Sequence, residues 1–459
     1  KFRPGRIPCA GRMNHRPFRL LAPLCAASVI GAVAPSALAR TVVLVRGSGW
    51  GNGVGMSQWG AEGYAAHGAA YRTILAHYYP HTTITTAADR PLRVLLEQSA
   101  YRVRIRSTVP FLIVDDLGRK IHRPAGSIVF DSRLEAADKP LAAPVRIEPG
   151  AQPLTLDGRG YRGTLTVARQ GGTLTVIDTL PLELYLRGVV PSEIPEHWMP
   201  AAYAAQAVAA RSYALATLKP GRAFDLYADN RSQIYGGIAA ETPATNAAVA
   251  YTTGQVLSYD GQIIVAYYDS NSGGRTAPVQ DVFPGLSPEP YLVSVSDPYG
   301  AAAPNGRWLV PLTDEKLSQQ FGFAIDDARA MHVGPGIASS VELLGPGGSR
   351  TLTPTEFAQA FGLRSLHYAF SVLSLDAPAP VRTGKALVLA GYLRDIGHIE
   401  LQRLLPGGGW QHLRAVRARP DGRFVETLRA VAGEYRLAVD GIAGPVVTAV
   451  VRLASHTRP

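Results

Sequence analysis

Apolar and polar residues alternate along much of the chain, and this pattern predicts a strand-rich protein. Between residues 91 and 180, short apolar runs with a period of two are separated by glycine and aspartate turns, as in half-buried strands. The strands expected there are Arg93–Gln98, Tyr101–Ser107, Phe111–Asp115, Val145–Glu148, Leu154–Leu156, Gly163–Ala168 and Thr173–Thr179. Two more are expected at Gln255–Ser258 and Ile263–Tyr268.

Helices are expected at a few alanine-rich or amphipathic stretches. The longest, Ala201–Lys219, is free of glycine and proline and is dominated by alanine, the strongest helix former. Shorter helices are expected near Ala61–His67, Tyr71–Tyr79, Ala244–Thr252, Glu315–Phe321 and Pro354–Phe361. This mixture of many strands and few helices predicts the α+β class.

The length predicts two or three domains. About 420 residues follow a predicted leader, which is too many for one hydrophobic core. Residues 40–375 are expected to form the main domain, with a β-rich part at 91–180, a helical region at 181–218 and a small mixed subdomain at 306–372. After the linker Asp376–Pro380, residues 381–459 predict a separate all-β sandwich of immunoglobulin-like style.

The first 39 residues are interpreted as a leader that contains a secretory signal. Arg16 and Arg19 form a basic region, Leu20–Val33 an apolar region, and Ala37-Leu38-Ala39 a small-residue cleavage site. An uncleaved membrane anchor is the competing interpretation, and prolines within and after the apolar run disfavour it. Removal of the leader predicts a secreted or envelope protein without a stable membrane span.

Removal of the leader also changes the charge and the cysteine count. Residues 1–39 carry six of the Lys and Arg residues and no acid, so the net charge falls from +11 to +5. The remaining basic residues are interpreted as scattered, and no nucleic-acid groove is expected. Because Cys9 and Cys25 both precede residue 40, the mature chain offers no disulfide and no thiolate metal site.

Glycine occupies every second position from Gly47 to Gly55, followed by Met56-Ser57-Gln58-Trp59-Gly60. A strand with this period would have one face bare of side chains, which a polymer could approach closely. Trp50, Gln58 and Trp59 are residue types that often contact sugars. The alternative is a tight structural loop, and the sequence alone leaves both interpretations open.

Glu193 lies between apolar residues just before the alanine-rich run. Burial beside Val190, Ile194 and Trp198 would raise its pKa and make it a proton donor near neutral pH. In the alternative interpretation, Ser192 caps the following helix and Glu193 interacts with the positive end of that helix, which would lower the pKa. A second polar segment, Asp269–Thr276, is either a substrate-contacting turn or an ordinary polar turn.

Four segments together resemble the SpoIID/LytB family, whose catalytic members are lytic transglycosylases of bacterial peptidoglycan. The segments are residues 181–195 around Glu193, residues 204–213 in the alanine-rich run, the Gly-Gly turn at 270–276 and the Gly-rich motif at 49–60. The resemblance covers residues 41–372. It implies that Glu193 is the single general acid and base, with Glu183 and Glu196 as fallback carboxylates. The substrate-binding residues that it implies are Gln206, Arg211, Tyr213, Gln233, Tyr235, Ser270, Ser272, Gly273, Gly274, Asn52, Ser57 and Gln58.

The sequence departs from the family pattern at three points. The Gly-rich motif precedes the Gly-Gly turn instead of following it, which implies a permuted order. Asp269 and Ser272 occupy positions where many members carry His and Cys, so no metal site and no cofactor are expected. Asn52 stands where the motif often has His. Arg211 lies on a different side of the helix from Gln206, so a structural salt bridge is an alternative to a sugar contact.

The resemblance implies cleavage of the bond between N-acetylmuramic acid and N-acetylglucosamine, leaving 1,6-anhydromuramoyl ends on glycan strands stripped of stem peptides. Two alternatives remain open at this stage. In the first alternative to the enzyme, the chain is a non-catalytic glycan-binding enhancer of a cell-wall amidase. In the second, it is an adhesin or matrix module in which residues 381–459 carry the function. The expected partners are therefore peptidoglycan glycan strands and a cell-wall amidase.

Overall fold

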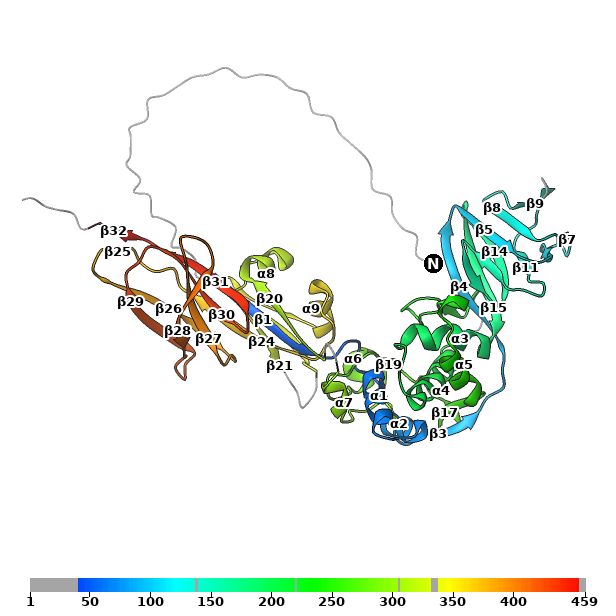
Figure 1. The fold of residues 1–459 in the computed structure, drawn as a ribbon, viewed down its shortest axis with the longest axis horizontal. Coiled ribbons are helices and arrows are strands. Elements are labelled where there is room, and N and C mark those ends of the chain that lie inside the picture. Colours follow the sequence, from blue (N-terminus) through cyan, green and yellow to red (C-terminus); the bar gives the residue numbers. More distant parts are fainter. Residues whose placement is uncertain (1–39, 137–138, 219–220, 304–305, 332–336, 454–459) are drawn as a thin grey trace, which may run out of the picture. The chain divides into compact units, whose positions relative to one another are not determined.

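The computed structural model describes residues 40–136, 139–218, 221–303, 306–331 and 337–453 (Figure 1). Strands outnumber helices in these ranges, which confirms the predicted α+β class. The predicted leader, residues 1–39, lies outside the described residues. Among the helices that are described, none combines the length and the apolar character needed to cross a bilayer.

The helices of the described residues are α1 Gln58–Ala66, α2 Tyr71–Tyr78, α3 Leu182–Glu193, α4 Pro200–Ala216, the 3-10 helix η1 Gly237–Ala240, α5 Pro243–Tyr251, α6 Val279–Val282, α7 Pro298–Ala301, α8 Asp314–Phe321 and α9 Pro354–Phe361. The six predicted helices all form close to the predicted positions, and the described residues add α3, α6, α7 and the 3-10 helix η1. Helix α3 is not among the predicted helices, because Gly188 and Pro191 both lower the helix propensity of its sequence. Its apolar face is buried regardless, so tertiary packing outweighs propensity.

The β-rich part forms two antiparallel sheets around one core. The first has the order β16-β4-β15-β14-β11-β6-β7, and the second β13-β12-β5-β8. Their bounds are β4 Pro91–Ala100, β5 Arg102–Ser107, β6 Phe111–Val114, β7 Lys120–Arg123, β8 Gly126–Asp131, β11 Val145–Glu148, β12 Leu154–Leu156, β13 Arg159–Tyr161, β14 Thr164–Gln170, β15 Thr173–Pro181 and β16 Leu226–Tyr227. All seven strands predicted between residues 91 and 180 form. Strand β16 is added in parallel to β4.

A five-stranded sheet joins the two ends of the described chain. Its order is β20-β1-β24-β26-β29, with bounds β1 Arg40–Ser48, β20 Arg307–Thr313, β24 Tyr368–Leu375, β26 Ala386–Arg394 and β29 Arg423–Arg429. In Figure 1 the blue strand β1 lies among yellow and orange strands. Because β24 pairs with β26 across the linker at residues 376–380, the structure differs from the predicted separation of residues 381–459 at this point.

The C-terminal strands form a second sheet of order β28-β27-β30-β31, with bounds β27 Ile399–Leu404, β28 Trp410–Val416, β30 Gly433–Val439 and β31 Ile442–Ala449. Strand β1 alternates between two cores, because successive side chains of a strand face opposite sides. Val42 and Leu44 pack with the C-terminal strands, while Val43 and Val45 pack with the subdomain at 306–372. The C-terminal core therefore needs β1 as well as residues 381–459.

The remaining sheets are small. They have the orders β18-β17-β3, β21-β22-β23, β19-β2, β10-β9 and β25-β32. Their bounds are β2 Met56–Ser57, β3 Thr83–Thr86, β9 Glu135–Ala136, β10 Lys139–Pro140, β17 Gln255–Tyr259, β18 Gln262–Ile263, β19 Tyr268–Asp269, β21 Asp327–Met331, β22 Ser340–Gly345, β23 Gly348–Leu352, β25 Val381–Arg382 and β32 Val451–Arg452.

Helix α4 lies between two hydrophobic cores. Tyr203, Ala207 and Ala210 pack into the core of the β-rich part, while Ala205 and Val208 pack into the core formed by α1, α2 and the strands near residue 257. A helix that is buried on opposite faces has little room for large side chains, which explains its alanine content. The arrangement brings α3, α4 and the Gly-rich motif into contact around one site.

Candidate active site around Glu193

Glu193 is the last residue of α3, and the chain leaves the helix at Ile194 in an extended conformation. The helix ends here because Pro195 follows, and a residue before proline disfavours the helical conformation. Glu193 therefore lies at the negative end of a helix dipole, where a carboxylate charge is disfavoured. The alternative in which Ser192 caps the next helix is wrong, since Ser192 lies within α3 and α4 begins at Pro200.

The Glu193 carboxyl is half-buried, and burial raises its pKa above the ordinary value. Two hydrogen bonds oppose the rise. The backbone N–H of Ile234 donates to Oε1 at 2.6 Å, and the Tyr268 side chain supplies the second bond. Within the described part of the chain, no second carboxylate contributes to the shift. Loss of water thus favours the protonated form of this acid.

Three tyrosines lie close to Glu193. Burial raises the pKa of Tyr185, Tyr213 and Tyr268, and the charge of Glu193 adds to the rise in each case. The rings of Tyr213 and Tyr268 are in an edge-to-face arrangement with centroids 6.4 Å apart. Tyr213 was predicted from the sequence. Tyr185 and Tyr268 were not, although Tyr185 lies inside the resembling segment 181–195 and Tyr268 directly precedes the polar turn.

Gln233 links two of these tyrosines. The Tyr268 hydroxyl donates to Gln233 Oε1 at 2.7 Å, and Gln233 Nε2 donates to the Tyr185 hydroxyl at 3.3 Å. Gln233 was predicted as a substrate-binding residue. Because it is fully buried, it connects the two tyrosines beneath the surface. Both of its amide atoms are used, so the Tyr268 and Tyr185 hydroxyls are held in place beside Glu193 by the same buried side chain.

The loop that carries Gln233 is hydrogen-bonded to α3. The Gly236 N–H donates to the Gly188 carbonyl at 3.0 Å, and the Tyr235 hydroxyl donates to buried Asp178 at 3.0 Å. A Cβ at Gly188 would lie 2.6 Å from the Tyr235 ring, so only glycine permits this approach. Tyr235 is buried and therefore holds the loop, while exposed Ile234 presents its N–H to Glu193.

The Gly-rich motif and the Gly-Gly turn form one structure. Strand β2 pairs in parallel with β19, which places Met56 beside Tyr268. Trp50 and Asn271 exchange backbone hydrogen bonds of 2.7 and 3.1 Å. The order of the two motifs is thus compatible with their meeting in space, and Tyr268 connects them to Glu193.

The glycines of the motif form a loop, not the strand with a bare face. β1 ends at Ser48, and Gly49 and Gly55 have φ of 84° and 75°. A Cβ at Gly55 would lie 2.0 Å from the Tyr267 carbonyl oxygen. The alternation therefore supplies left-handed backbone conformations that allow close packing against residues 267–273. The structural-loop interpretation describes this segment.

Most of the polar residues predicted in these two motifs are engaged inside the protein. Ser57 is buried and caps α1 by accepting from Gly60 N at 3.1 Å, and Gln58 is buried beside it. Buried Ser272 donates to Asp297, and Asn52 accepts from the backbone of Val54 at 2.7 Å. Ser270, Gly273 and Gly274 are only half-buried. These contacts shape the loop more than they offer groups to a ligand.

The two predicted polar residues of α4 differ. Arg211 is fully buried, and its guanidinium pairs with Glu183 through two hydrogen bonds of 2.7 Å. The structure thus favours the salt-bridge alternative for Arg211 and makes Glu183 its partner. Gln206 is also buried, and in the described part of the chain neither of its amide atoms has a hydrogen-bond partner. Glu196 is exposed and precedes α4 without belonging to it.

Two cavities border the segment that follows Glu193. One, of about 410 Å³, is lined by residues that include Ile194 and Pro195, and the other, of about 650 Å³, by residues that include Trp198 and Tyr251. Tyr203 lines both cavities, although Glu193 itself lines neither. Trp198 also contacts Trp59 of the Gly-rich motif, with ring centroids 5.0 Å apart. Aromatic side chains of the Gly-rich motif and of the segment after Glu193 therefore contact each other.

Comparison with known proteins places Glu193 inside a recognised segment. Residues 170–259 match the sequence model of the SpoIID family, described as stage II sporulation protein. The amidase enhancer of Bacillus subtilis (strain 168) is 35% identical over 170 residues, covering 36% of this chain and 22% of that protein. Stage II sporulation protein D of the same organism is 31% identical over 172 residues, covering 34% of this chain and 50% of that protein.

A second stage II sporulation protein D, from Bacillus amyloliquefaciens, is 32% identical over 167 residues, covering 31% of this chain and 47% of that protein. The chain therefore spans half or less of the length of these curated relatives. No solved structure matches the chain.

Proposed function

We propose that this protein, whose residues 170–259 match the sequence model of the SpoIID family, is a peptidoglycan lytic transglycosylase with Glu193 as its single general acid and base. The names of the relatives support a function related to the cell wall. The observation that carries the finer proposal is the carboxyl of Glu193, which burial favours in its protonated form without help from a second carboxylate. A secreted location in the cell envelope is part of the proposal.

The reaction requires one carboxyl because the substrate supplies the nucleophile. Protonated Glu193 gives its proton to the glycosidic oxygen between N-acetylmuramic acid and N-acetylglucosamine, and the bond from that oxygen to C1 breaks. The muramoyl C6 hydroxyl then bonds to C1, and the Glu193 carboxylate takes the hydroxyl proton. The acid is regenerated, no water is consumed, and the product ends in 1,6-anhydromuramic acid. An ordinary glycosidase would need two carboxyls.

The neighbours of Glu193 suit both halves of this cycle. Burial favours the protonated form that the first step consumes, whereas Ile234 N–H and Tyr268 stabilise the carboxylate that the second step uses. The two effects on the pKa of Glu193 oppose each other, and the rise caused by burial is the larger. Tyr268 and Gln233 act as positioning residues in this scheme.

Substitution Glu193→Gln tests the proposal. It removes the transferable proton while keeping the size of the side chain and one acceptor for Ile234 N–H, so the fold should persist. We expect anhydromuramoyl products from peptide-stripped glycan strands to disappear, measured by mass spectrometry of the digest. Glu196→Gln is the matched control, because it makes the same charge change three residues away on an exposed side chain.

Undiminished anhydro product from the Glu193→Gln protein would exclude Glu193 as the acid. Equal release from intact and amidase-treated sacculi would reject the proposed preference for stripped strands. Loss of product in the Glu196→Gln control would show that the assay responds to the change of charge and not to the loss of the Glu193 acid.

A second candidate function is enhancement of a cell-wall amidase, which the name of one relative, the amidase enhancer, favours. The same digest separates the two functions. Binding to glycan and stimulation of an added amidase, without any anhydromuramic ends from the wild-type protein, would favour the enhancer. Anhydro ends that depend on Glu193 would favour the enzyme.

A further inference from the structure

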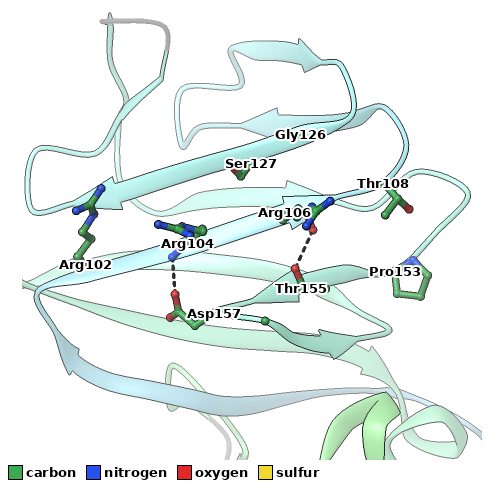
Figure 2. Close-up of a pocket in the computed structure, with 10 residues that line it drawn as sticks. Arg102, Arg104, Arg106, Thr108, Gly126, Ser127, Pro153, Thr155 and Asp157 are labelled. Carbon is green, nitrogen blue, oxygen red and sulfur yellow. Dashed lines mark hydrogen bonds between the residues drawn. The ribbon is translucent and has the colours of Figure 1, made fainter.

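Strand β5 carries a row of arginines on one face. Its residues alternate strictly, so Val103 and Ile105 are buried in the core, while Arg102, Arg104 and Arg106 are exposed on the opposite side. Figure 2 shows the three arginines in a row along this strand. The basic residues of the sequence were interpreted as scattered, but these three lie together, because a period of two puts alternate side chains on the same face of a strand.

These arginines line an open groove. Its volume is about 930 Å³, and strands β8 and β12 flank β5 on either side of it. Besides the arginines, the groove is lined by small residues, several of which carry hydroxyl groups, and by one acid. These residues are Thr108, Gly126, Ser127, Pro153, Thr155, Asp157 and Gly158. The floor is therefore cationic and the walls are small and polar.

The positive charge of the groove is not neutralised from within. Among the described residues, none of the three guanidinium groups takes part in an ion pair or a side-chain hydrogen bond. Asp157 accepts from the backbone N–H of Arg104 at 3.0 Å, and Asp131, opposite Arg102, pairs with Arg133 at 3.0 Å. Asp157 keeps its negative charge in the groove, and Asp131 also interacts electrostatically with Arg102, but three arginines outnumber the one acid of the lining. The guanidinium N–H groups, which have no partner among the described residues, can therefore bind an anion.

We propose that this groove binds an extended polyanion built of polyol phosphate or sugar phosphate units. Alternate residues of a strand are about 7 Å apart, so the row presents three cations at that repeat. A phosphodiester chain with a three-carbon unit has as many backbone bonds per phosphate as two amino-acid residues have, so its charges repeat at a similar length. Arg102, Arg104 and Arg106 each contact one phosphate, and the hydroxyls of Ser127 and Thr155 face the polyol.

The lining disfavours two other polyanions. Single-stranded nucleic acid has a similar phosphate repeat, but proteins hold it by stacking bases on aromatic rings, and none of the residues that line the groove is aromatic. A membrane surface is flat and is entered by apolar side chains, whereas this site is a walled groove without an exposed apolar anchor. The proposal does not depend on the role of Glu193.

Binding of labelled poly(glycerol phosphate) to the full chain tests the proposal. We expect affinity that falls steeply with salt, and a triple Arg102→Gln, Arg104→Gln, Arg106→Gln variant that binds about tenfold to a hundredfold more weakly with a shallower salt dependence. A triple Arg→Lys variant at the same positions should retain most of the affinity. The control, with Arg417, Arg419 and Arg429 changed to Gln, alters the net charge equally at three exposed positions elsewhere, two in a loop and one in β29.

Equal weakening in the groove variant and the control variant would overturn the proposal, as would unchanged binding in both. Tighter binding of an oligothymidylate with the same number of phosphates would assign the groove to nucleic acid, and capture by anionic vesicles alone would assign it to a membrane. The Glu193→Gln protein should bind the polymer like wild type. Failure of the enzymatic proposal and failure of this one are therefore distinguishable.

Discussion

Removing Glu183 should destabilise the protein through the arginine that it leaves behind. The Arg211 side chain is completely buried, and the Glu183 carboxylate is 17% exposed. Two bonds of 2.7 Å join them. Arg211 also donates to the carbonyls of Gln255 at 3.1 Å and of Val249 and Ala207 at 3.4 Å. The guanidinium thus ties α3 to α4 and to the segment after α5.

The magnitude follows from these contacts. In Glu183→Ala the guanidinium keeps its carbonyl partners but loses its counter-charge while fully buried, which costs about 3–5 kcal/mol of unfolding free energy. Glu183→Gln leaves one acceptor and should cost less. A double variant, Glu183→Leu with Arg211→Met, removes both charges and should be more stable than either single variant, because no buried charge remains unpaired.

Urea unfolding of the wild type, Glu183→Leu, Arg211→Met and the double variant, with Glu183→Ala and Glu183→Gln alongside, measures these differences by tryptophan fluorescence and circular dichroism. The reasoning predicts a coupling free energy between the two residues of about 2–3 kcal/mol in the double-mutant cycle. Additive losses would refute it. So would a fully stable Arg211→Met protein that fails to cleave glycan, because that result would return Arg211 to the predicted role of a sugar contact.

Two further predictions concern proton equilibria. Tyr268→Phe removes a hydrogen bond that lowers the pKa of Glu193, so this pKa should rise further. The pH at which glycan cleavage declines on the alkaline side should therefore move upward. A pH–rate profile, with Tyr213→Phe as control, measures the difference. An alkaline limb of the pH–rate profile that stays in place or moves to lower pH would contradict this prediction. Burial raises the pKa of Asp269 to about 8, so its stabilising contribution is complete below about pH 4 and is lost as the pH rises through about 8. Asp269→Asn should flatten this decline in melting temperature, and an identical slope in both proteins would count against it.

Local patterns were enough to predict most elements. The seven strands between residues 91 and 180 form because each alternates apolar and polar side chains, and one face of each must be covered. Helix α9 begins and ends where predicted, since Thr353 and Glu356 form a capping box and Gly362 ends it in a left-handed conformation. These signals lie within a few residues of one another.

Other features required contacts between distant segments. Strand β1 completes a sheet with β24 and β26, more than 300 residues away, and no local pattern specifies that partner. The alternating glycines suggested a strand, but their positive φ values depend on the approach of residues 267–273. Ser57 and Ser272 looked like ligand contacts because their burial is invisible in the sequence.

The sequence by itself determined the α+β class, the alanine-rich helix and Glu193 as the acid to examine, because these depend on residue type and short-range spacing. Only the tertiary structure decided that Tyr185, Gln233 and Tyr268 lie around this acid and that Arg211 neutralises Glu183. It also decided that three arginines on one face of β5 line a groove, with guanidinium groups that pair with none of the described residues. Burial and pairing of charges are properties of the packed chain, since water is excluded only when segments far apart in sequence come together.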